Sequence, residues 1–213
     1  MNALALIDGA ISDYDSVYAM QLDLVDKKRR GEVLLDYLIL VEHPNVYTVG
    51  RKAQKEWDAT ELPAPAHLIE RGGETTYHCP GQLVCYPILS LSKEERDLLG
   101  YLRKLEDTLI DTLRDFGLEG ESRKGATGVW LVGKDKKIAS IGIAVSSWVT
   151  YHGVALNVTN DLTGFQAIRP CGFPSEVMTS MKEQLGKKCP TMEEAKESFL
   201  RNFSCHFHRT LLS

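Results

Sequence analysis

The sequence lacks long hydrophobic runs, a basic leader and an excess of positive charge. No apolar run in its 213 residues approaches the roughly 20 residues that a bilayer-spanning helix needs. The N-terminus soon meets acidic residues, so we expect neither a signal peptide nor a transit peptide. A net charge of −4 gives no general attraction to nucleic acid or to an anionic membrane. These absences favour a cytoplasmic protein that binds neither nucleic acid nor membrane.

Cysteine is scarce and irregularly spaced. The chain has five cysteines, an odd number, and no Cys-x-x-Cys pair. This pattern argues against a zinc ribbon and against a dithiol redox motif, and we expect no metal site. Free thiols in a reducing compartment are the default, and most of them behave as small buried hydrophobes.

No internal repeat, low-complexity tract or linker divides the chain. A composition of 43% hydrophobic and 25% charged residues is that of an ordinary globular protein, and the length fits one domain over residues 1–213. Strand patterns dominate the middle, with helical patterns at both ends and one between. This order predicts an α+β fold in which helices flank a mixed, largely antiparallel sheet.

Three segments carry helix signals, at residues 13–30, 92–117 and 191–210. The second and third begin with Ser or Thr followed three residues later by Glu, the pattern of a capping box. The second has the longest apolar stripe and ends at a glycine, so we expect it to pack on the core. The first ends in four basic residues, which are either a solvated helix end or a docking patch for an acidic partner.

Strand patterns fill much of the remainder. Residues 37–43 and 83–91 are apolar runs typical of buried strands. Residues 128–145 predict a hairpin that turns at 133–135, and the end of this hairpin is expected to pair with residues 153–158. We find no functional signal before residue 31 or after about residue 185.

Residues 71–82 form a loop rich in glycine, between two short strand-like runs. Such a loop lets the backbone approach a ligand or another part of the protein closely. His78 in this loop is either satisfied by the backbone or an imidazole donor near a reacting carbonyl. A nucleophile–base dyad of His78 and Cys79 is a weak hypothesis, because adjacent side chains rarely reach each other in that geometry.

Two further residues are candidates for chemistry. Cys171 lies between Pro170 and Gly172, which predict a tight loop that presents the thiol, and it is either a nucleophile or an inert loop cysteine. Lys137 begins an apolar strand. It is either a solvated strand end or a cation that lowers the pKa of a neighbouring thiol.

Four motifs together resemble the lipoyl(octanoyl)transferase family, in the order and approximate spacing of that family, over residues 37–181. They are Arg71-Gly72-Gly73 with Thr76-Tyr77-His78-x-Pro80-Gly81-Gln82, then Lys137-Ile138-Ala139-Ser140-Ile141-Gly142, then His152-Gly153-Val154-Ala155-Leu156-Asn157-Val158, and finally Pro170-Cys171-Gly172. The resemblance implies the fold shared by biotin protein ligases and lipoate ligases.

The resemblance also implies an acyltransferase reaction in two steps, the first step of protein lipoylation. Cys171 would attack the thioester of octanoyl-acyl carrier protein, and Lys137 would lower the pKa of that thiol and shuttle protons. The octanoyl group would then pass to a lysine of a lipoyl domain, in a 2-oxoacid dehydrogenase acyltransferase subunit or in the glycine cleavage H protein. Neither ATP nor a cofactor is needed, because thioester exchange is nearly isoenergetic, and a monomer is expected.

The same resemblance implies an acyl-binding wall. Its residues would be Arg71, Gly72, Gly73, Glu74, Thr75, Thr76, Tyr77, His78, Ser140, Ile141, Gly142, Gly153, Val154 and Ala155. Cys79 departs from the family, which usually has glycine there. A side chain is strained at that position if the backbone is left-handed. We expect Cys79 to be a tolerated substitution and not a second nucleophile.

Three alternatives stay open. An ATP-dependent lipoate–protein ligase needs the lysine but no loop cysteine, so Cys171 favours the transferase. An amidotransferase that moves octanoyl between lipoyl domains also uses a cysteine and is excluded less firmly. A non-catalytic module that binds lipoyl domains would not need both Lys137 and Cys171.

Overall fold

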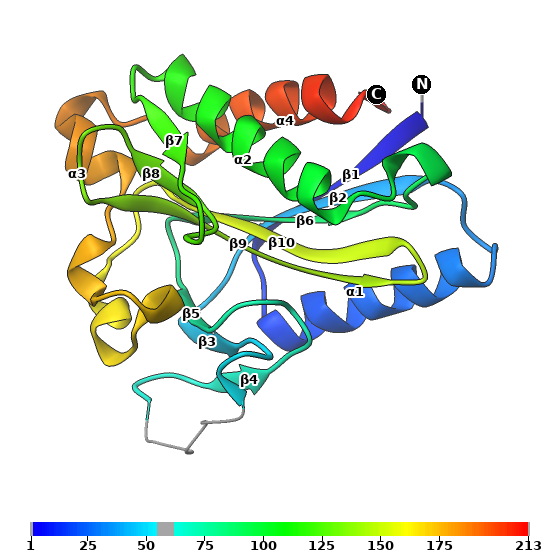
Figure 1. The fold of residues 1–213 in the computed structure, drawn as a ribbon, viewed down its shortest axis with the longest axis horizontal. Helices are drawn as coiled ribbons and strands as arrows, with labels where there is room; N and C mark the ends of the chain where they lie inside the picture. Colours follow the sequence, from blue (N-terminus) through cyan, green and yellow to red (C-terminus); the bar gives the residue numbers. More distant parts are fainter. Residues whose placement is uncertain (1, 55–61, 213) are drawn as a thin grey trace.

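The computed structural model describes residues 2–54 and 62–212 (Figure 1). The α-helices are α1 (Tyr14–Arg29), α2 (Leu98–Asp115), α3 (Met181–Leu185) and α4 (Met192–Phe207). The strands are β1 (Asn2–Ile11), β2 (Asp36–Glu42), β3 (Val46–Val49), β4 (Ala66–Leu68), β5 (Thr75–His78), β6 (Gln82–Ile88), β7 (Gly120–Ser122), β8 (Val129–Leu131), β9 (Lys137–Ser146), β10 (Val149–Asn157) and β11 (Arg209–Leu211). Among the described residues, no helix is long and apolar enough to cross a bilayer.

The strands form a large sheet and a small one. The large sheet has the order β11-β1-β2-β6-β10-β9-β8-β7 and the small sheet the order β4-β3-β5. β1 pairs in parallel with both β11 and β2, whereas every other pair of neighbouring strands in the large sheet is antiparallel. α2 and α4 cover one face of the large sheet, and α1 lies on the other (Figure 1). The predicted α+β fold with a mixed, largely antiparallel sheet is confirmed.

Both predicted hairpins are present, but residues 141–145 pair with residues 150–154 and not with the predicted 153–158. β8 pairs with β9, and β9 pairs with β10 in a long ladder in which Ser146 faces Val149. The two residues between them, Ser147 and Trp148, have φ values of 50° and 65°. Positive φ at both positions is what a type I′ turn requires, and its twist matches that of the two strands.

The chain ends differ from the sequence-based expectation. β1 forms from residues that carried no strand prediction, and it lies inside the large sheet between β11 and β2. The last helix was predicted to run towards Thr210, but it ends at Phe207, where His208 has a φ of 51° and the chain turns into β11. The parallel pairing of β11 with β1 explains the early end, because it needs residues 209–211 to be extended.

The start of α2 also differs. The Ser92 amide donates to the Glu95 carboxylate at 3.0 Å, as a capping box requires, but this box encloses a separate 3₁₀ turn, Lys93–Glu95. α2 has its own N-cap, Asp97, which accepts from the Leu99 amide. Leu98 falls on the apolar stripe predicted for residues 92–117, but it is exposed, because it precedes the first turn that reaches the core.

The apolar stripes of the helices form two hydrophobic layers on the large sheet. α2 buries Leu105, Leu109 and Leu113 in one cluster with Phe199 and Phe203 of α4. On the opposite face, α1 contributes Val17, Leu24 and Val25 to a second cluster with residues of β2, β6 and β10. The spacing of four residues in α2 and α4, and of seven between Val17 and Leu24 in α1, is that of one helix face, which explains why the helix predictions succeeded.

A buried ionic network joins the chain ends to the sheet. Lys28 Nζ lies 2.9 Å from Asp36 Oδ1, and Arg209 Nε lies 2.9 Å from Asp36 Oδ2. Arg209 also contacts the Glu95 carboxylate at 2.8 Å. These contacts join α1, β2, β11 and the turn before α2. One interpretation of the basic run at the end of α1 was a solvated helix end. Lys28 is buried, so that interpretation does not hold for the whole run.

A second buried polar network joins the small sheet to the large one. Thr48 of β3 faces His78 of β5, whose Nδ1 lies 2.8 Å from Gln82 Oε1 at the start of β6. The Gln82 amide donates to Asn157 Oδ1 of β10 at 2.9 Å, and Asn157 donates in turn to the Thr179 carbonyl. All five residues are buried. Burying polar groups is tolerable only when they are paired, so this network fixes how the two sheets meet.

Asp36→Asn should destabilise the fold strongly, because it leaves Lys28 as a buried cation without a carboxylate and leaves Arg209 with Glu95 alone. The expected loss of unfolding free energy is about 3 kcal/mol or more. The control is Asp26→Asn, which removes an exposed ion pair between α1 and its C-cap residue, Arg30, and should change stability by less than about 0.5 kcal/mol. Equal losses for the two variants in urea titrations would contradict the role given to the network.

Lowering the pH should also destabilise the protein, through His78. Burial lowers the pKa of His78 from 6.5 to about 3. Below pH 6.5 the unfolded chain therefore binds a proton that the folded chain does not, and the unfolding free energy falls as the pH falls. Urea titrations at pH 7 and pH 5 measure the loss of unfolding free energy between the two pH values. This loss should be smaller for His78→Gln than for the wild type. For His208→Asn, which replaces an exposed histidine, it should equal that of the wild type. Identical losses in all three proteins would refute the assignment.

Candidate active site

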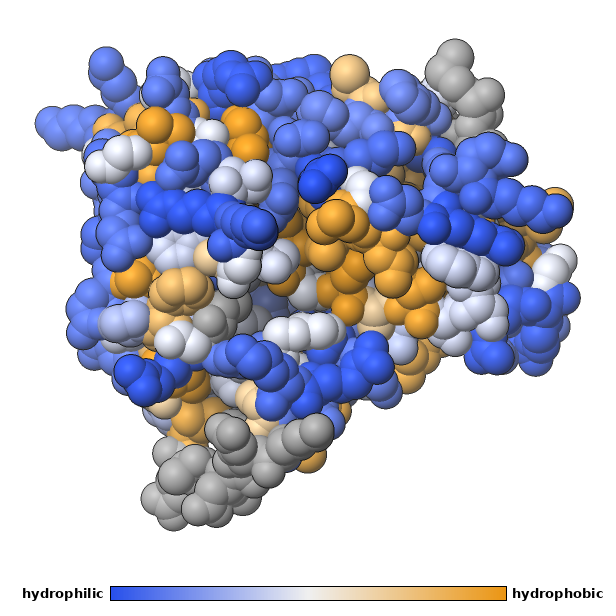
Figure 2. All heavy atoms as spheres, viewed as in Figure 1, coloured by the Kyte–Doolittle hydropathy of each residue, from blue (hydrophilic) through white to orange (hydrophobic). Residues whose placement is uncertain are grey.

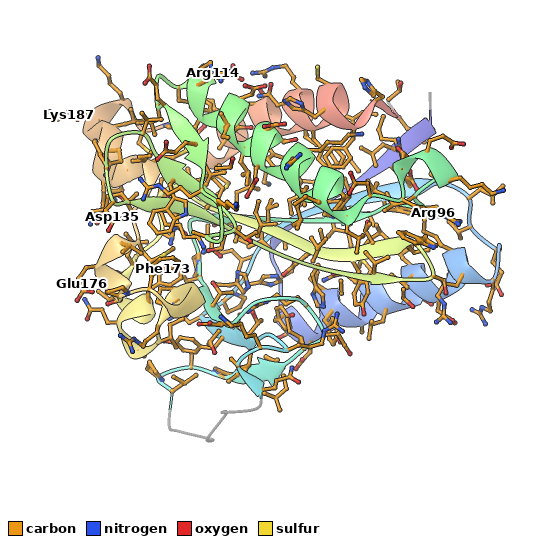
Figure 3. All side chains as sticks on the ribbon, viewed as in Figure 1. Arg96, Arg114, Asp135, Phe173, Glu176 and Lys187 are labelled. Atoms are coloured by element: carbon orange, nitrogen blue, oxygen red, sulfur yellow. The ribbon has the colours of Figure 1, made fainter. Side chains whose placement is uncertain are left out.

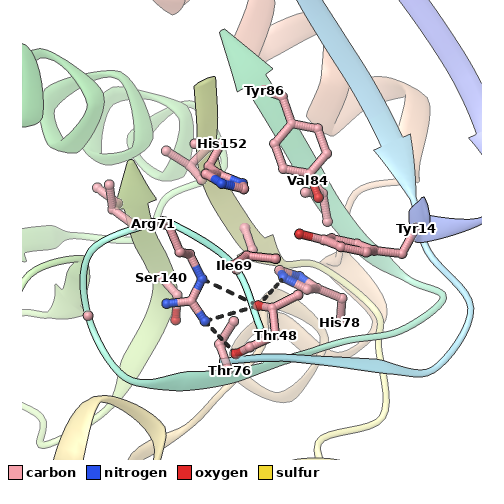
Figure 4. A pocket seen from close by; sticks show the side chains of 16 residues that line it. Tyr14, Thr48, Ile69, Arg71, Thr76, His78, Val84, Tyr86, Ser140 and His152 are labelled. Atoms are coloured by element: carbon pink, nitrogen blue, oxygen red, sulfur yellow. Dashed lines mark hydrogen bonds between the residues drawn. The ribbon is translucent and has the colours of Figure 1, made fainter. Parts of the chain in front are cut away.

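A cavity lies where the small sheet meets the large one (Figure 4). Its walls come from α1, β3, β5, β6, β9 and β10 and from the loop that precedes β5. The predicted wall residues that line it are Arg71, Gly73, Thr76, His78, Ser140, Ile141, Gly142, Gly153, Val154 and Ala155. The fold thus brings together three motifs that lie far apart in the sequence.

The remaining predicted wall residues lie elsewhere. Gly72 and Glu74 line a neighbouring cavity. Thr75 is buried within β5. Tyr77 points to the opposite side of β5, where it stacks near Tyr47 and lines a third cavity. The alternation of side chains along a strand accounts for this separation of Tyr77 from Thr76 and His78.

Glycine lets the loop before β5 approach β3 and β9 closely. A Cβ added at Gly50 would lie 2.4 Å from the Gly73 carbonyl oxygen, and one at Gly142 would lie 2.8 Å from Arg71 Cδ. Gly73 itself has a φ of +85°. The Gly72 amide donates to the Ile143 carbonyl at 3.0 Å, which attaches the loop to β9. The predicted close approach is confirmed, and it is an approach to other parts of the protein.

Arg71 is held by this packing. Its Nη2 donates to the Thr48 carbonyl at 2.6 Å and to Thr48 Oγ1 at 2.9 Å, and its Nη1 donates to the Gly72 carbonyl at 3.1 Å (Figure 4). The guanidinium is buried beside the cavity. Its positive charge adds to burial in lowering the pKa of His78, and it also lowers that of His152.

His78 is a neutral histidine with both ring nitrogens facing protein groups. Because Gln82 Oε1 can only accept, Nδ1 carries the proton, and Nε2 is left as an acceptor 3.5 Å from Thr48 Oγ1. The proposed dyad with Cys79 is wrong, since the Cys79 thiol lies 3.4 Å from the Asp161 carbonyl in another cavity. Burial raises the pKa of Cys79 to about 11. Its φ is not positive, so the backbone strain considered for this position does not arise.

His152 occupies the other end of the cavity. Its φ of 54° is left-handed although it lies within β10, and its ring is almost completely buried. Burial lowers its pKa to about 4. Nε2 lies 3.8 Å from Glu70 Oε2, and the Glu70 carboxylate also accepts from the Tyr18 hydroxyl.

Several cavity groups were missed by the sequence analysis. Tyr14 and Thr48 line the cavity, as do Val84 and Tyr86 of β6. Tyr14 belongs to the segment that carried no functional signal, and only the position of its helix in space brings it to the cavity. Four buried polar atoms of the lining have no hydrogen-bond partner among the described residues. They are Tyr14 Oη, Thr76 Oγ1, Ser140 Oγ and His152 Nε2.

Lys137 is fully buried, so its interpretation as a solvated strand end is wrong. Its Nζ donates to the Thr127 carbonyl at 2.8 Å and lies 5.9 Å from the centre of the Trp130 ring. Gly128 makes room for it, because a Cβ there would lie 2.7 Å from Lys137 Cε and 2.4 Å from the Ala139 carbonyl oxygen. The lysine side chain is therefore enclosed by the turn before β8.

Cys171 lies in a 3₁₀ turn, Pro170–Gly172, that packs against β5. A Cβ added at the next residue, Gly172, would lie 3.2 Å from the Glu74 carboxylate. The predicted turn with proline before and glycine after the cysteine is therefore present. The side chain of Cys171 lies outside the described residues, so its partnership with Lys137 stays a prediction.

Comparison with known proteins assigns the fold and the family. Residues 13–204 match the model of the lipoyl protein ligase A/B catalytic domain. The octanoyltransferase of Synechococcus elongatus is 49% identical to this chain, over 84% of this chain and 77% of that protein. The octanoyltransferase of Christiangramia forsetii is 41% identical, over 93% of this chain and 91% of that protein.

Solved structures resemble the fold at low sequence identity. Lipoate-protein ligase A bound with ATP superposes with a TM-score of 0.73 at 17% identity, over 100% of this chain and 89% of that one. Biotin protein ligase from Aquifex aeolicus superposes with a TM-score of 0.53 at 13% identity, over 98% of this chain and 70% of that one. These likenesses concern the fold alone, and they confirm the predicted ligase-like architecture. By the family match and the identity to octanoyltransferases, the chain belongs to the lipoyl protein ligase A/B catalytic domain family.

Proposed function

We propose that the chain is an octanoyltransferase that acts in protein lipoylation. Relatives that match this chain at 41–49% identity, over most of their own length, are named octanoyltransferases. The octanoyl donor is octanoyl-acyl carrier protein. The acceptor is a lysine of a lipoyl domain, in a 2-oxoacid dehydrogenase acyltransferase subunit or in the glycine cleavage H protein.

The observation that carries this proposal is the burial of Lys137 in a fold that also holds the Pro170–Gly172 turn against β5. A lysine enclosed by protein stabilises a neighbouring thiolate more than a solvated one would, because water screens it less. A thiol with a lowered pKa is the nucleophile that thioester exchange requires. A ligase that activates its acid as an adenylate has no use for that thiol.

The reaction then proceeds in two balanced steps. The Cys171 thiolate attacks the carbonyl carbon of the octanoyl thioester, the carbon–sulfur bond to the carrier breaks, and the released carrier thiolate takes a proton from Lys137. The ε-amine of the acceptor lysine next attacks the acyl-enzyme. An octanoyl amide forms, Cys171 leaves as thiolate, and Lys137 takes back the proton that the amine loses.

The cavity suits the acyl chain. Ile69, Ile141, Val84, Val154 and Ala155 supply apolar walls. Burying an eight-carbon chain contributes several kcal/mol to binding, at about 0.8 kcal/mol for each methylene removed from water. We place the carbonyl end of the chain near Ser140, because Ser140 is the cavity residue of β9 that lies nearest in sequence to Lys137.

A second candidate is transfer of octanoyl between lipoyl domains, which uses the same cysteine and the same cavity. It differs only in the donor. Octanoyl-acyl carrier protein and an octanoylated lipoyl domain, offered separately to the wild type, distinguish the two reactions by which of them forms the acyl-enzyme.

Cys171→Ser should abolish the acyl-enzyme. After mixing with octanoyl-acyl carrier protein without ATP, intact mass spectrometry should find one octanoyl group on the wild type and none on the variant, because the serine hydroxyl stays protonated. Cys205→Ser, which removes an exposed thiol on α4, is the control and should behave as the wild type. An octanoyl adduct on Cys171→Ser would refute the nucleophile. A wild type that reacts only with ATP and free octanoate would refute the transferase.

Lys137→Ala should slow alkylation of Cys171 by iodoacetamide at pH 7 by about tenfold or more. One pKa unit of lost thiolate stabilisation corresponds to that factor. The pH at which alkylation is half-maximal should rise correspondingly. The control is Lys134→Ala, which removes an exposed lysine of the preceding turn. Rates that match the wild type from pH 6 to pH 9 would remove Lys137 from the activation of the thiol.

A further inference from the structure

The cavity between the small sheet and the large one, to which the acyl chain was assigned above, is here called the acyl cavity. A second cavity adjoins it and shares part of its wall. Gly73, Ile141 and Gly142 line both spaces. The face shown in Figure 2 is hollowed near its centre, with apolar side chains gathered along one side. The residues that line only the second cavity come from α2 and β9, from the segments after β3 and before β5, from the turn before β8 and from the segment after Cys171.

A thioester needs space on both sides of its reacting carbon. When the acyl chain fills the first cavity, the arm that carries the leaving sulfur must extend from the reacting carbon in another direction. The residues shared by the two cavities mark a junction between them. Thr127, which lines the second cavity, holds Lys137 Nζ through its carbonyl at 2.8 Å. The second cavity therefore begins beside the group that would protonate the leaving sulfur.

The lining of the second cavity is amphipathic and nearly uncharged. Leu102 and Ile143 are partly buried apolar side chains on its wall. Phe173, labelled in Figure 3, lines another side. Its ring packs edge-on against Trp130, with ring centres 5.1 Å apart. The charges that line the cavity, Lys52 and Glu74, neutralise each other in an ion pair of 2.5 Å. Gly125 leaves open space, with nothing within 4 Å of a Cβ built there.

We propose that this second cavity, the arm slot, binds the pantetheine arm of the octanoyl donor. The proposal rests on the proposed function and adds to it the site of the leaving group. A pantetheine arm is a narrow, uncharged chain of amides and methyl-bearing carbons, so it matches a slot with apolar walls and a paired charge at its rim. Thioester exchange releases the arm as a thiol within the slot, and it must leave before an acceptor lysine enters.

The test blocks the slot without touching the acyl cavity. Leu102→Trp and Ile143→Trp each place a large ring in the slot, at positions that do not line the acyl cavity. Leu99→Trp and Val145→Trp are the matched controls. Each lies on the same helix or strand as its partner and does not line the slot. Tryptophan is favoured in strands, so the β9 variants remain available should the helix variant fail to fold.

The substrates separate the slot from the acyl cavity. Acyl-enzyme formation is followed by intact mass with octanoyl-pantetheine, which has the arm, and with p-nitrophenyl octanoate, which lacks it. The slot variants should show a KM for octanoyl-pantetheine raised at least tenfold, with unchanged kinetics towards p-nitrophenyl octanoate. The control variants should match the wild type with both substrates.

Two results would overturn the arm slot. One is a KM for octanoyl-pantetheine that is unchanged in both folded slot variants. The other is an equal loss with both substrates, which would mean that the second cavity is not separate from the acyl cavity. Failure of the wild type to form an acyl-enzyme with either substrate would instead refute the proposed function, so the two failures are distinguishable.

Discussion

The buried polar network from Thr48 to Asn157 is the constraint on which the site depends. Each member lies on a different strand or loop, and each donor meets an acceptor within 3.5 Å. A slip of one residue in β5 would turn His78 away from Gln82 and leave both buried without partners. The network therefore fixes the small sheet on the large one in a single register. That register, in turn, decides which side chains of β5 face the acyl cavity.

The glycines around the cavity follow from this arrangement. Because the network holds β5 close to β3 and β9, the loop that precedes β5 must pass between them, where a Cβ at Gly50 or Gly142 would collide with Gly73 or Arg71. Much of the Arg71-Gly72-Gly73 motif is thus explained by packing within the protein. A ligand need not contact every glycine of the motif, and Gly72 does not line the acyl cavity.

The sequence predicted those features that depend on local pattern. The amphipathic helices, the β9–β10 hairpin and the close approach of the glycine loop follow from periodicity and backbone freedom. It could not predict β1, whose strand character comes from parallel partners at residues 36–42 and 209–211. Tyr14 was missed for a related reason, since only tertiary packing brings α1 against the cavity. Lys137 at a strand start is typically solvated, and its burial depends on Gly128 and Trp130, which no local pattern reveals.

The burial of Lys137 is costly for folding, and this cost favours a chemical role. Removing an ammonium group from water carries a penalty of several kcal/mol, which one carbonyl and one aromatic ring offset in part. An apolar side chain of similar length would fill the same space beneath Gly128 without that penalty. Glu106, whose pKa burial raises, accepts the Gly128 amide at 3.3 Å and adds a carboxyl group near the lysine. The turn before β8 therefore does more than close a hairpin, because Thr127 in this turn holds the lysine beside the second cavity, where the proposed mechanism needs a cation.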